Sequence, residues 1–282
     1  MADATTINAK DVKDLRDKTG AGMMECKKAL QETGGDVEKA IDWLRAKGAA
    51  KAAKRADKSA NEGFIGSYVH FDGKTAVIVE LNCETDFVAK NAEFLSFAGT
   101  VAERVATQNP TDVNALSGLA ANGGTVEDER KLLAGKIGES IAIRRFARVT
   151  GKGKLAQYVH GGAKIGVLVD LVGGDESLAR DIAMQVAAAK PVALSPSEVS
   201  PDIVERERNI AAAKAAESGK PDDIQKKMVE GAVQKSLKDL ALLEQPFVKN
   251  DKQSVGALLK SKGASVAGFA LFVMGEGTEK KS

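Results

Sequence analysis

The sequence predicts an α+β protein that combines helical bundles with two short β-rich regions. Apolar residues recur at helical spacing over residues 7–46 and again after residue 200. From Gly63 the apolar pattern changes to β-rich runs, and one of these runs is repeated later in the chain. At ~100–200 residues per domain, a chain of 282 residues corresponds to about two or three compact units.

Composition excludes several classes of function. Lys and Arg number 41 against 39 Asp and Glu, so the net charge of +2 gives no overall attraction to nucleic acid or to an acidic membrane. Aromatic residues make up 4%, too few for a base-stacking platform. Residues 1–10 lack the apolar core of a signal peptide, and no run approaches the ~20 apolar residues of a membrane span. We therefore expect a soluble, cytoplasmic protein without a membrane partner.

Cysteine and histidine are scarce. The two cysteines, Cys26 and Cys83, are far apart, which argues against a disulfide scaffold and fits a reducing compartment. A zinc site built from Cys and His would need both cysteines to converge with His70 and His160, the only two histidines. We expect neither a metal site nor a cofactor.

Residues 7–46 are predicted to form three short helices. Glycines separate the helices, and Asp36 is a plausible N-cap for the third. The apolar residues at helical spacing are Val12 and Leu15, then Met23, Cys26 and Leu30, then Val37, Ile41 and Leu44. A unit of about forty residues is near the lower limit for independent folding, so it should be marginal or docked.

The segment Arg45 to Lys58 carries six basic residues among alanines, with Asp57 as its only acid. This composition favours a helix. The segment is either a solvated helical linker, which we favour, or a contact for nucleic acid.

A β-hairpin is predicted next, from Phe64–Phe71 and Thr75–Leu81 around the turn Asp72-Gly73. A helix should follow over Ala89–Ala106, with Phe94, Phe97, Val101 and Val105 on its apolar face. Another helix is predicted over Val126–Ile143. It contains Gly135 and Gly138, which indicate either close helix packing or a partner that approaches the backbone.

An internal repeat then appears. Tyr68-Val69-His70 recurs as Tyr158-Val159-His160, and the match continues without a gap to Leu81 and Leu171. Each copy is predicted to be a hairpin followed by a helix, the second helix covering about 178–189. The centre of the chain is therefore predicted to hold two duplicated β-hairpin/helix subdomains.

After a loop rich in Pro and Ser, two long charged helices are predicted over Asp202–Glu217 and Asp222–Leu243. Their short connection favours an antiparallel hairpin, and the β pattern resumes only at Val266–Met274. The helices therefore form an inserted arm. The predicted domains are residues 1–58 (three helices and the basic linker helix), 59–150 (core N-subdomain), 151–194 with 245–275 (core C-subdomain), 195–244 (helical arm) and 276–282 (C-terminal tail).

Motifs of nucleotide-binding and hydrolytic enzymes are absent from the sequence. It contains no phosphate-binding G-x-x-x-x-G-K-[ST] loop, no G-x-S-x-G elbow, and no spacing that pairs either histidine with a nucleophile. We therefore expect a binding protein that is not an enzyme.

The end of the first hairpin, Asn82 to Lys90, has two interpretations. Thr85 or Asp86 caps the next helix while Phe87 and Val88 enter the core, or Phe87 is an exposed anchor at a rigid turn. The pattern alone favours the first.

Two stretches resemble signatures of the bacterial translation elongation factor Ts family. They are T-G-A-G-M-M-E-C-K-K-A-L, from Thr19, and N-C-E-T-D-F-V-A-K, from Asn82. Further matches occur in the right order at Lys136-Ile137-Gly138-Glu139, His160-Gly161 and 227–231, so the resemblance covers nearly the whole chain. It implies a ubiquitin-associated-like N-terminal domain, two core subdomains and a coiled-coil arm.

The resemblance also implies a function, the exchange of GDP for GTP on elongation factor Tu without direct nucleotide binding. The partner-binding residues that it implies are Thr85, Asp86, Phe87 and Val88, which disturb the Mg²⁺ site, and Arg16, Met23, Met24, Ile137, Gly138 and His160. Of Met23 and Met24, we expect one to pack inside the three-helix unit and one to meet the partner. The arm is also a candidate for contacts between two copies of the chain. The alternative function is an RNA- or ribosome-associated binding protein that acts through residues 45–58.

Overall fold

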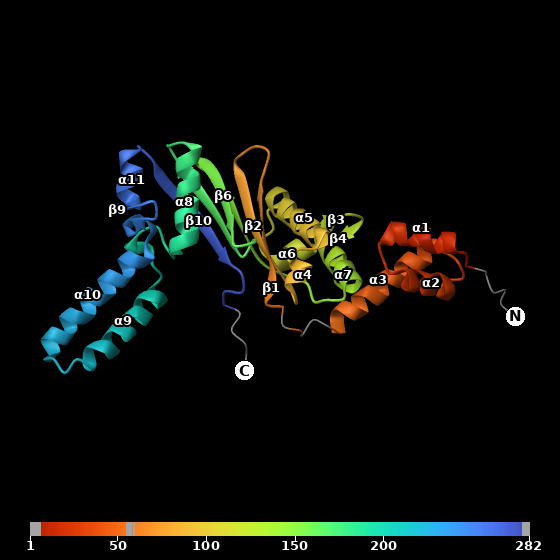
Figure 1. The fold of residues 1–282 in the computed structure, drawn as a ribbon, viewed down its shortest axis with the longest axis horizontal. Helices are drawn as coiled ribbons and strands as arrows, with labels where there is room; N and C mark the ends of the chain where they lie inside the picture. Colours follow the sequence, from red (N-terminus) through yellow and green to blue (C-terminus); the bar gives the residue numbers. More distant parts are fainter. Residues whose placement is uncertain (1–6, 55–57, 59, 278–282) are drawn as a thin grey trace. The chain divides into compact units, whose positions relative to one another are not determined.

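The computed structural model describes residues 7–54, 58 and 60–277, which form a mixed helical and β structure (Figure 1). They divide into two compact units. Of the described residues, the first unit contains 7–54, 58, 60–68, 79–147 and 273–277, and the second contains 69–78 and 148–272. Within the described residues, no helix has both the length and the apolar character that crossing a membrane requires.

The first unit begins with three helices, α1 (Ala9–Thr19), α2 (Met23–Glu32) and α3 (Val37–Lys54). Asn8 caps α1 by accepting a 2.8 Å hydrogen bond from the Asp11 amide, and Gly20 ends it in a left-handed conformation. The helices close over a small core of Val12, Leu15, Cys26, Ala29, Leu30, Ala40 and Leu44. The three predicted helices are confirmed, apart from the position of Met23, which is exposed.

Helix α3 continues through the basic segment as far as Lys54. The side chains of residues 51–57 lie outside the described part of the chain, so the nucleic-acid interpretation stays a prediction there. Upstream of them, α3 packs against α7 (Val126–Ile137): a Cβ atom placed on Gly135 would lie 2.6 Å from the Cα of Gly48. The basic segment is therefore not wholly a solvated linker, and at Gly135 the close-packing interpretation is correct.

This backbone contact gives a testable prediction. Gly135→Ala should lower the free energy of unfolding by about 1–3 kcal/mol, because the added methyl group meets the backbone of Gly48. Gly99→Ala is the matched control, since Gly99 lies in a helix with open space around its Cα, and it should gain about 0.5–1 kcal/mol. Urea unfolding midpoints measure both. Equal shifts for the two variants would contradict the packing of α3 on α7.

The first sheet has the order β1-β2-β5, with β1 (Glu62–Val69), β2 (Thr75–Cys83) and β5 (Ala142–Thr150). The central strand β2 is buried along its whole length. After β2 come α4 (Asp86–Ala89), α5 (Ala92–Gln108), α6 (Val113–Ser117), the short pair β3 (Ala120–Ala121) and β4 (Gly124–Thr125), and then α7. The predicted apolar face of α5 is confirmed, since Phe94, Phe97, Val101 and Val105 are all buried.

The predicted helix Val126–Ile143 is wrong in its last six residues. Helix α7 ends at Ile137 because Gly138 adopts a left-handed conformation (φ 85°), and the chain then enters β5. The β-branched and aromatic residues Ile143, Phe146 and Val149 fit this strand.

The second unit contains a sheet of order β10-β7-β6, with β6 (Lys154–His160), β7 (Ile165–Val172) and β10 (Ser265–Val273). Helix α8 (Glu176–Ala189) packs on this sheet, burying Ile182 and Val186 against Val167, Val169 and Leu171 (Figure 1). In each sheet the second hairpin strand is central, with its hairpin partner on one side and a later strand on the other.

The two long helices of the second unit are α9 (Pro201–Ala216) and α10 (Asp222–Leu240), which pack along each other. Ala211, Val233 and Leu237 are buried between them and the segment at Ala193–Val199. Helix α10 ends three residues earlier than predicted, at Leu240, and a 3-10 turn follows at Leu242–Glu244. The pair β8 (Pro246–Phe247) and β9 (Asn250–Ser254) and helix α11 (Val255–Ser261) had no sequence prediction.

Candidate functional site

The turn after β2 is built from two successive helix caps. Thr85 has extended backbone angles, and its hydroxyl accepts a hydrogen bond of 3.4 Å from the Val88 amide, which starts α4. Only six residues after Thr85, Asn91 caps α5 by accepting bonds from the Glu93 and Phe94 amides at 2.8 and 3.3 Å. The chain is therefore tightly folded on both sides of Phe87.

Both sequence interpretations of this turn are partly right. Thr85 is the cap and Val88 is buried, as the capping interpretation predicts. Phe87, however, is 81% exposed, so its assignment to the core is wrong. The reason is geometric: α4 makes little more than one turn, Val88 and Ala89 face the interior, and Phe87 lies on the outer side. Asp86 is also exposed and pairs with Lys90 at 2.8 Å, which raises the pKa of the Lys90 ammonium.

A single carboxylate supports the backbone of this turn. Glu139 Oε2 accepts hydrogen bonds from the Glu84 and Thr85 amides at 3.1 and 3.0 Å, and its Oε1 accepts one from the Thr85 hydroxyl at 2.7 Å. Glu84 Oε1 in turn accepts a bond of 2.7 Å from the Ser140 amide. The Cys83 thiol donates to the Thr85 carbonyl at 3.2 Å. The turn and the loop after α7 are thus joined by bonds in both directions.

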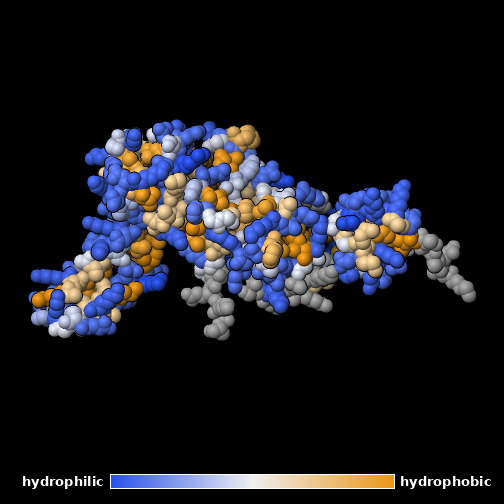
Figure 2. Space-filling view, viewed as in Figure 1, coloured by the Kyte–Doolittle hydropathy of each residue, from blue (hydrophilic) through white to orange (hydrophobic). Residues whose placement is uncertain are grey.

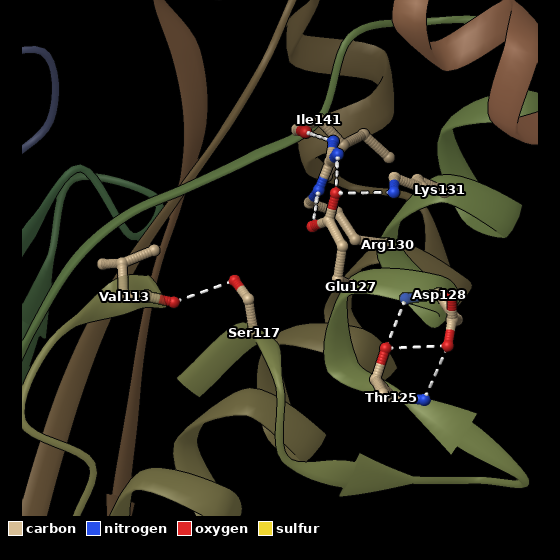
Figure 3. Close-up of polar contacts among 8 residues, drawn as sticks. All are labelled: Val113, Ser117, Thr125, Glu127, Asp128, Arg130, Lys131 and Ile141. Carbon is tan, nitrogen blue, oxygen red and sulfur yellow. Dashed lines mark hydrogen bonds and ion pairs between the residues drawn. The ribbon is translucent and has the colours of Figure 1, made fainter. Parts of the chain in front are cut away.

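The loop after α7 is held in turn by Arg130 (Figure 3). Its guanidinium donates to the Ile141 carbonyl at 2.6 Å and, through Nε and Nη2, to both oxygens of Glu127 at 2.7 Å. This pairing, with a smaller effect of Lys131, lowers the pKa of the Glu127 carboxyl. A capping box between Thr125 and Asp128 begins α7, and it lowers the pKa of the Asp128 carboxyl.

Ile137 and Gly138 are half-buried and directly precede Glu139, so the structure brings these two predicted residues to the Thr85–Val88 turn. Gly138 is the C-cap of α7, and a Cβ placed on it would meet nothing within 4 Å. Close packing therefore does not explain this glycine. Neither Glu139 nor Arg130 was predicted as a site residue, although Glu139 lies in the K-I-G-E stretch.

The predicted residues of the N-terminal helices all lie on the surface. Arg16 is exposed, and Met23 and Met24 are 44% and 76% exposed. The expectation that one methionine packs inside the unit is wrong. Helix α2 begins at Met23, and Cys26 is the first of its residues to enter the core.

The second unit contains His160, the last residue of β6, opposite Ile165 of β7. Its side chain is exposed, and its Nδ1 lies 3.1 Å from the Tyr158 hydroxyl. Another exposed aromatic residue, Phe71, was not predicted. It is 92% exposed at the turn between β1 and β2, and its ring lies 4.2 Å from that of His70. Its place beside Asp72-Gly73 was the only available signal, since turn residues are usually exposed.

Exposed apolar side chains on this surface are candidates for contacts with a partner. On the face in Figure 2, hydrophilic residues predominate and hydrophobic ones gather in separate groups. An aromatic ring on a rigid turn is the kind of residue that supplies binding energy in protein interfaces. Fold and site together define an α+β protein with an exposed aromatic side chain on a surface turn. The backbone of this turn is hydrogen-bonded to a carboxylate.

Comparisons with known proteins identify the family. The family model described as Elongation factor TS matches residues 84–276. Among curated relatives, an elongation factor Ts of Azoarcus sp. (strain BH72) is 59% identical over 98% of this chain and 93% of its own length. Those of Cupriavidus necator and Aromatoleum aromaticum are 56% and 55% identical over the same shares. The chain belongs to the elongation factor Ts family, a family of translation elongation factors.

Proposed function

We propose that this protein is a guanine-nucleotide exchange factor that binds the GTPase domain of elongation factor Tu, displaces Mg²⁺ and GDP, and allows GTP to reload. The observation that carries the proposal is the exposure of Phe87, which is 81% accessible on a turn fixed by Glu139. Asp86 and Phe87 enter between two helices of the GTPase and disturb its Mg²⁺ site. Loss of Mg²⁺ removes charge neutralisation from the phosphates, and GDP leaves.

Energetics require a broad interface. An exchange factor must bind the nucleotide-free partner more tightly than the GDP form, and a shift of about 10⁴ takes about 5.5 kcal/mol of differential affinity. Burial of one Phe supplies only about 1.5–3 kcal/mol. The exposed residues Arg16, Met23, Met24 and His160 are therefore proposed as further contacts, together with Ile137 and Gly138. Methionine suits this role because its unbranched side chain adapts to uneven surfaces.

The decisive experiment measures release of labelled GDP from elongation factor Tu with and without this protein. We expect strong acceleration that depends on protein concentration. No acceleration would overturn the proposal. Binding to RNA that weakens steeply with salt, together with no effect on GDP release, would favour the RNA-binding alternative through residues 45–58 instead.

The two histidines give a paired prediction. His160→Ala should slow GDP release several-fold, about 1 kcal/mol, because an exposed aromatic contact to the partner is removed. His70→Ala is the matched control, since His70 is the residue that corresponds to His160 in the sequence repeat and directly follows β1, and it should change the rate little. The same GDP-release assay compares them. Equal losses would contradict the assignment of His160.

A further inference from the structure

We propose that Glu139 is a positioning residue that sets the orientation of Phe87 by holding the backbone of the turn before it. The inference rests on the proposed function and adds a residue that acts through another one. Glu139 lies on the loop between α7 and β5, whereas Phe87 lies on α4. Hydrogen bonds from Glu84 and Thr85 to Glu139 connect them.

The Glu139 carboxylate accepts hydrogen bonds from backbone amides that lie beyond the end of strand β2. Strand β2 ends at Cys83, so the amides of Glu84 and Thr85 lie past its last residue, and Glu139 Oε2 accepts both, at 3.1 and 3.0 Å. Hydrogen bonds to a charged acceptor are stronger than neutral ones. The carboxylate therefore fixes two consecutive peptide groups immediately before α4.

The Thr85 hydroxyl carries this restraint into the helix. It donates to Glu139 Oε1 at 2.7 Å and accepts from the Val88 amide at 3.4 Å, so one oxygen links the carboxylate to the first turn of α4. Phe87 lies between these two anchored residues. Its own side chain is 81% exposed and receives little support from packing. Its direction is therefore set by the backbone beneath it.

Glu139 is itself on a fixed support. The next two residues of its loop are both anchored: the Ser140 amide donates to Glu84 at 2.7 Å, and the Ile141 carbonyl accepts from Arg130 at 2.6 Å. Figure 3 shows the Arg130 side chain directed at Ile141, with Glu127 on its other side. A restraint positions its target only when it is rigid itself, and these contacts supply that rigidity.

The consequence is pre-organisation of the binding turn. With Glu139 in place, the partner meets Phe87 already oriented and does not have to order the turn on binding. Without it, Phe87 keeps its chemistry but loses its fixed direction. This distinguishes the proposal from a direct contact between Glu139 and the partner, in which the effect of Glu139 would not depend on Phe87.

A double-mutant cycle in the GDP-release assay tests this dependence, using the full chain. Glu139→Ala should slow release about tenfold in the wild-type background and less than about twofold in the Phe87→Ala background. Glu139→Gln, which keeps one acceptor oxygen, should retain more activity than Glu139→Ala. The matched control is Glu103→Ala, which removes an exposed carboxylate from α5 and should leave the rate unchanged. Equal losses from Glu139→Ala in both backgrounds would overturn the proposal.

Amide hydrogen exchange followed by mass spectrometry tests the positioning without reference to the partner. In Glu139→Ala, exchange should rise about tenfold or more in the segment 83–90 and stay unchanged in the second unit. Unchanged protection of 83–90, or a uniform rise over the whole chain, would overturn the positioning role. If wild-type protein fails to release GDP, the proposed function is wrong, while this measurement still decides whether Glu139 holds the turn.

Discussion

Phe87→Ala is expected to slow GDP release by about thirtyfold, or about 2 kcal/mol, while the melting temperature stays nearly unchanged. The effect on GDP release and the effect on melting temperature differ because the Phe87 side chain is exposed. A side chain that is 81% exposed contributes little to its own fold, but it has most of its apolar surface to bury against a partner. A core phenylalanine would behave in the opposite way and lose about 3–5 kcal/mol of stability. Melting temperature and GDP release are measured on one preparation.

Phe71→Ala is the matched control for this prediction. Phe71 is also an aromatic residue on a turn and is 92% exposed, but the family signatures do not include it. It should leave both melting temperature and GDP release close to wild type. A large drop in melting temperature for Phe87→Ala, with normal exchange per folded molecule, would refute the role of Phe87 as an anchor.

The sequence pattern correctly predicted the elements in which the apolar residues keep one regular spacing between clear turn residues. The hairpins, the apolar face of α5 and the pair α9–α10 each have a consistent period and clear turn residues, so their positions were predicted within a few residues. The sequence prediction failed at β5 because the apolar spacing there does not change where the structure changes. Ile141, directly before β5, lies four residues after Ile137 and so continues the apolar spacing of α7, and the left-handed conformation of Gly138 ends the helix.

At the candidate site, too, the local sequence pattern does not report contacts that depend on the tertiary structure. Sequence pattern located the turn and its cap at Thr85, but it could not decide whether Phe87 points in or out, because that depends on which face of a four-residue helix is covered. The role of Glu139 could not be predicted from the sequence pattern. Its contacts to Glu84 and Thr85 span more than fifty positions of sequence, and no local spacing reports them.

Glu80 is the position at which we expect the largest loss of stability. It is fully buried on β2, and its two oxygens meet Arg144 Nη1 at 2.7 Å and Arg145 Nε at 2.6 Å, both on β5. The Gly275 amide also donates to it, at 3.1 Å. Glu80→Ala removes the buried carboxylate that both guanidinium groups share and leaves the exposed Glu276 carboxylate, 3.5 Å from Arg145. This loss should cost about 3–5 kcal/mol in the free energy of unfolding.

The effect should also reach the end of β10 and the turn after it. Arg145 donates to the Val273 carbonyl at 3.1 Å, and Arg144 donates to the Glu276 carbonyl, so the Glu80 cluster holds residues 273–276 against the first sheet. In Glu80→Ala, amide exchange over these residues should therefore rise together with the loss in stability. Glu80→Gln should fall between Glu80→Ala and wild type, because it keeps an acceptor oxygen but removes the charge.

An exposed ion pair provides the control. Lys249 pairs with Asp181 at 2.6 Å and is half-exposed, so solvent screens the pair, and Lys249→Ala should cost less than about 1 kcal/mol. Urea unfolding curves of both variants give the comparison. If Glu80→Ala costs no more than Lys249→Ala, or if residues 273–276 remain as protected as in wild type, the Glu80 cluster does not hold this segment. We expect the larger cost at Glu80 because its carboxylate is shielded from water and forms two short ion pairs, whereas the Lys249–Asp181 pair is exposed to solvent.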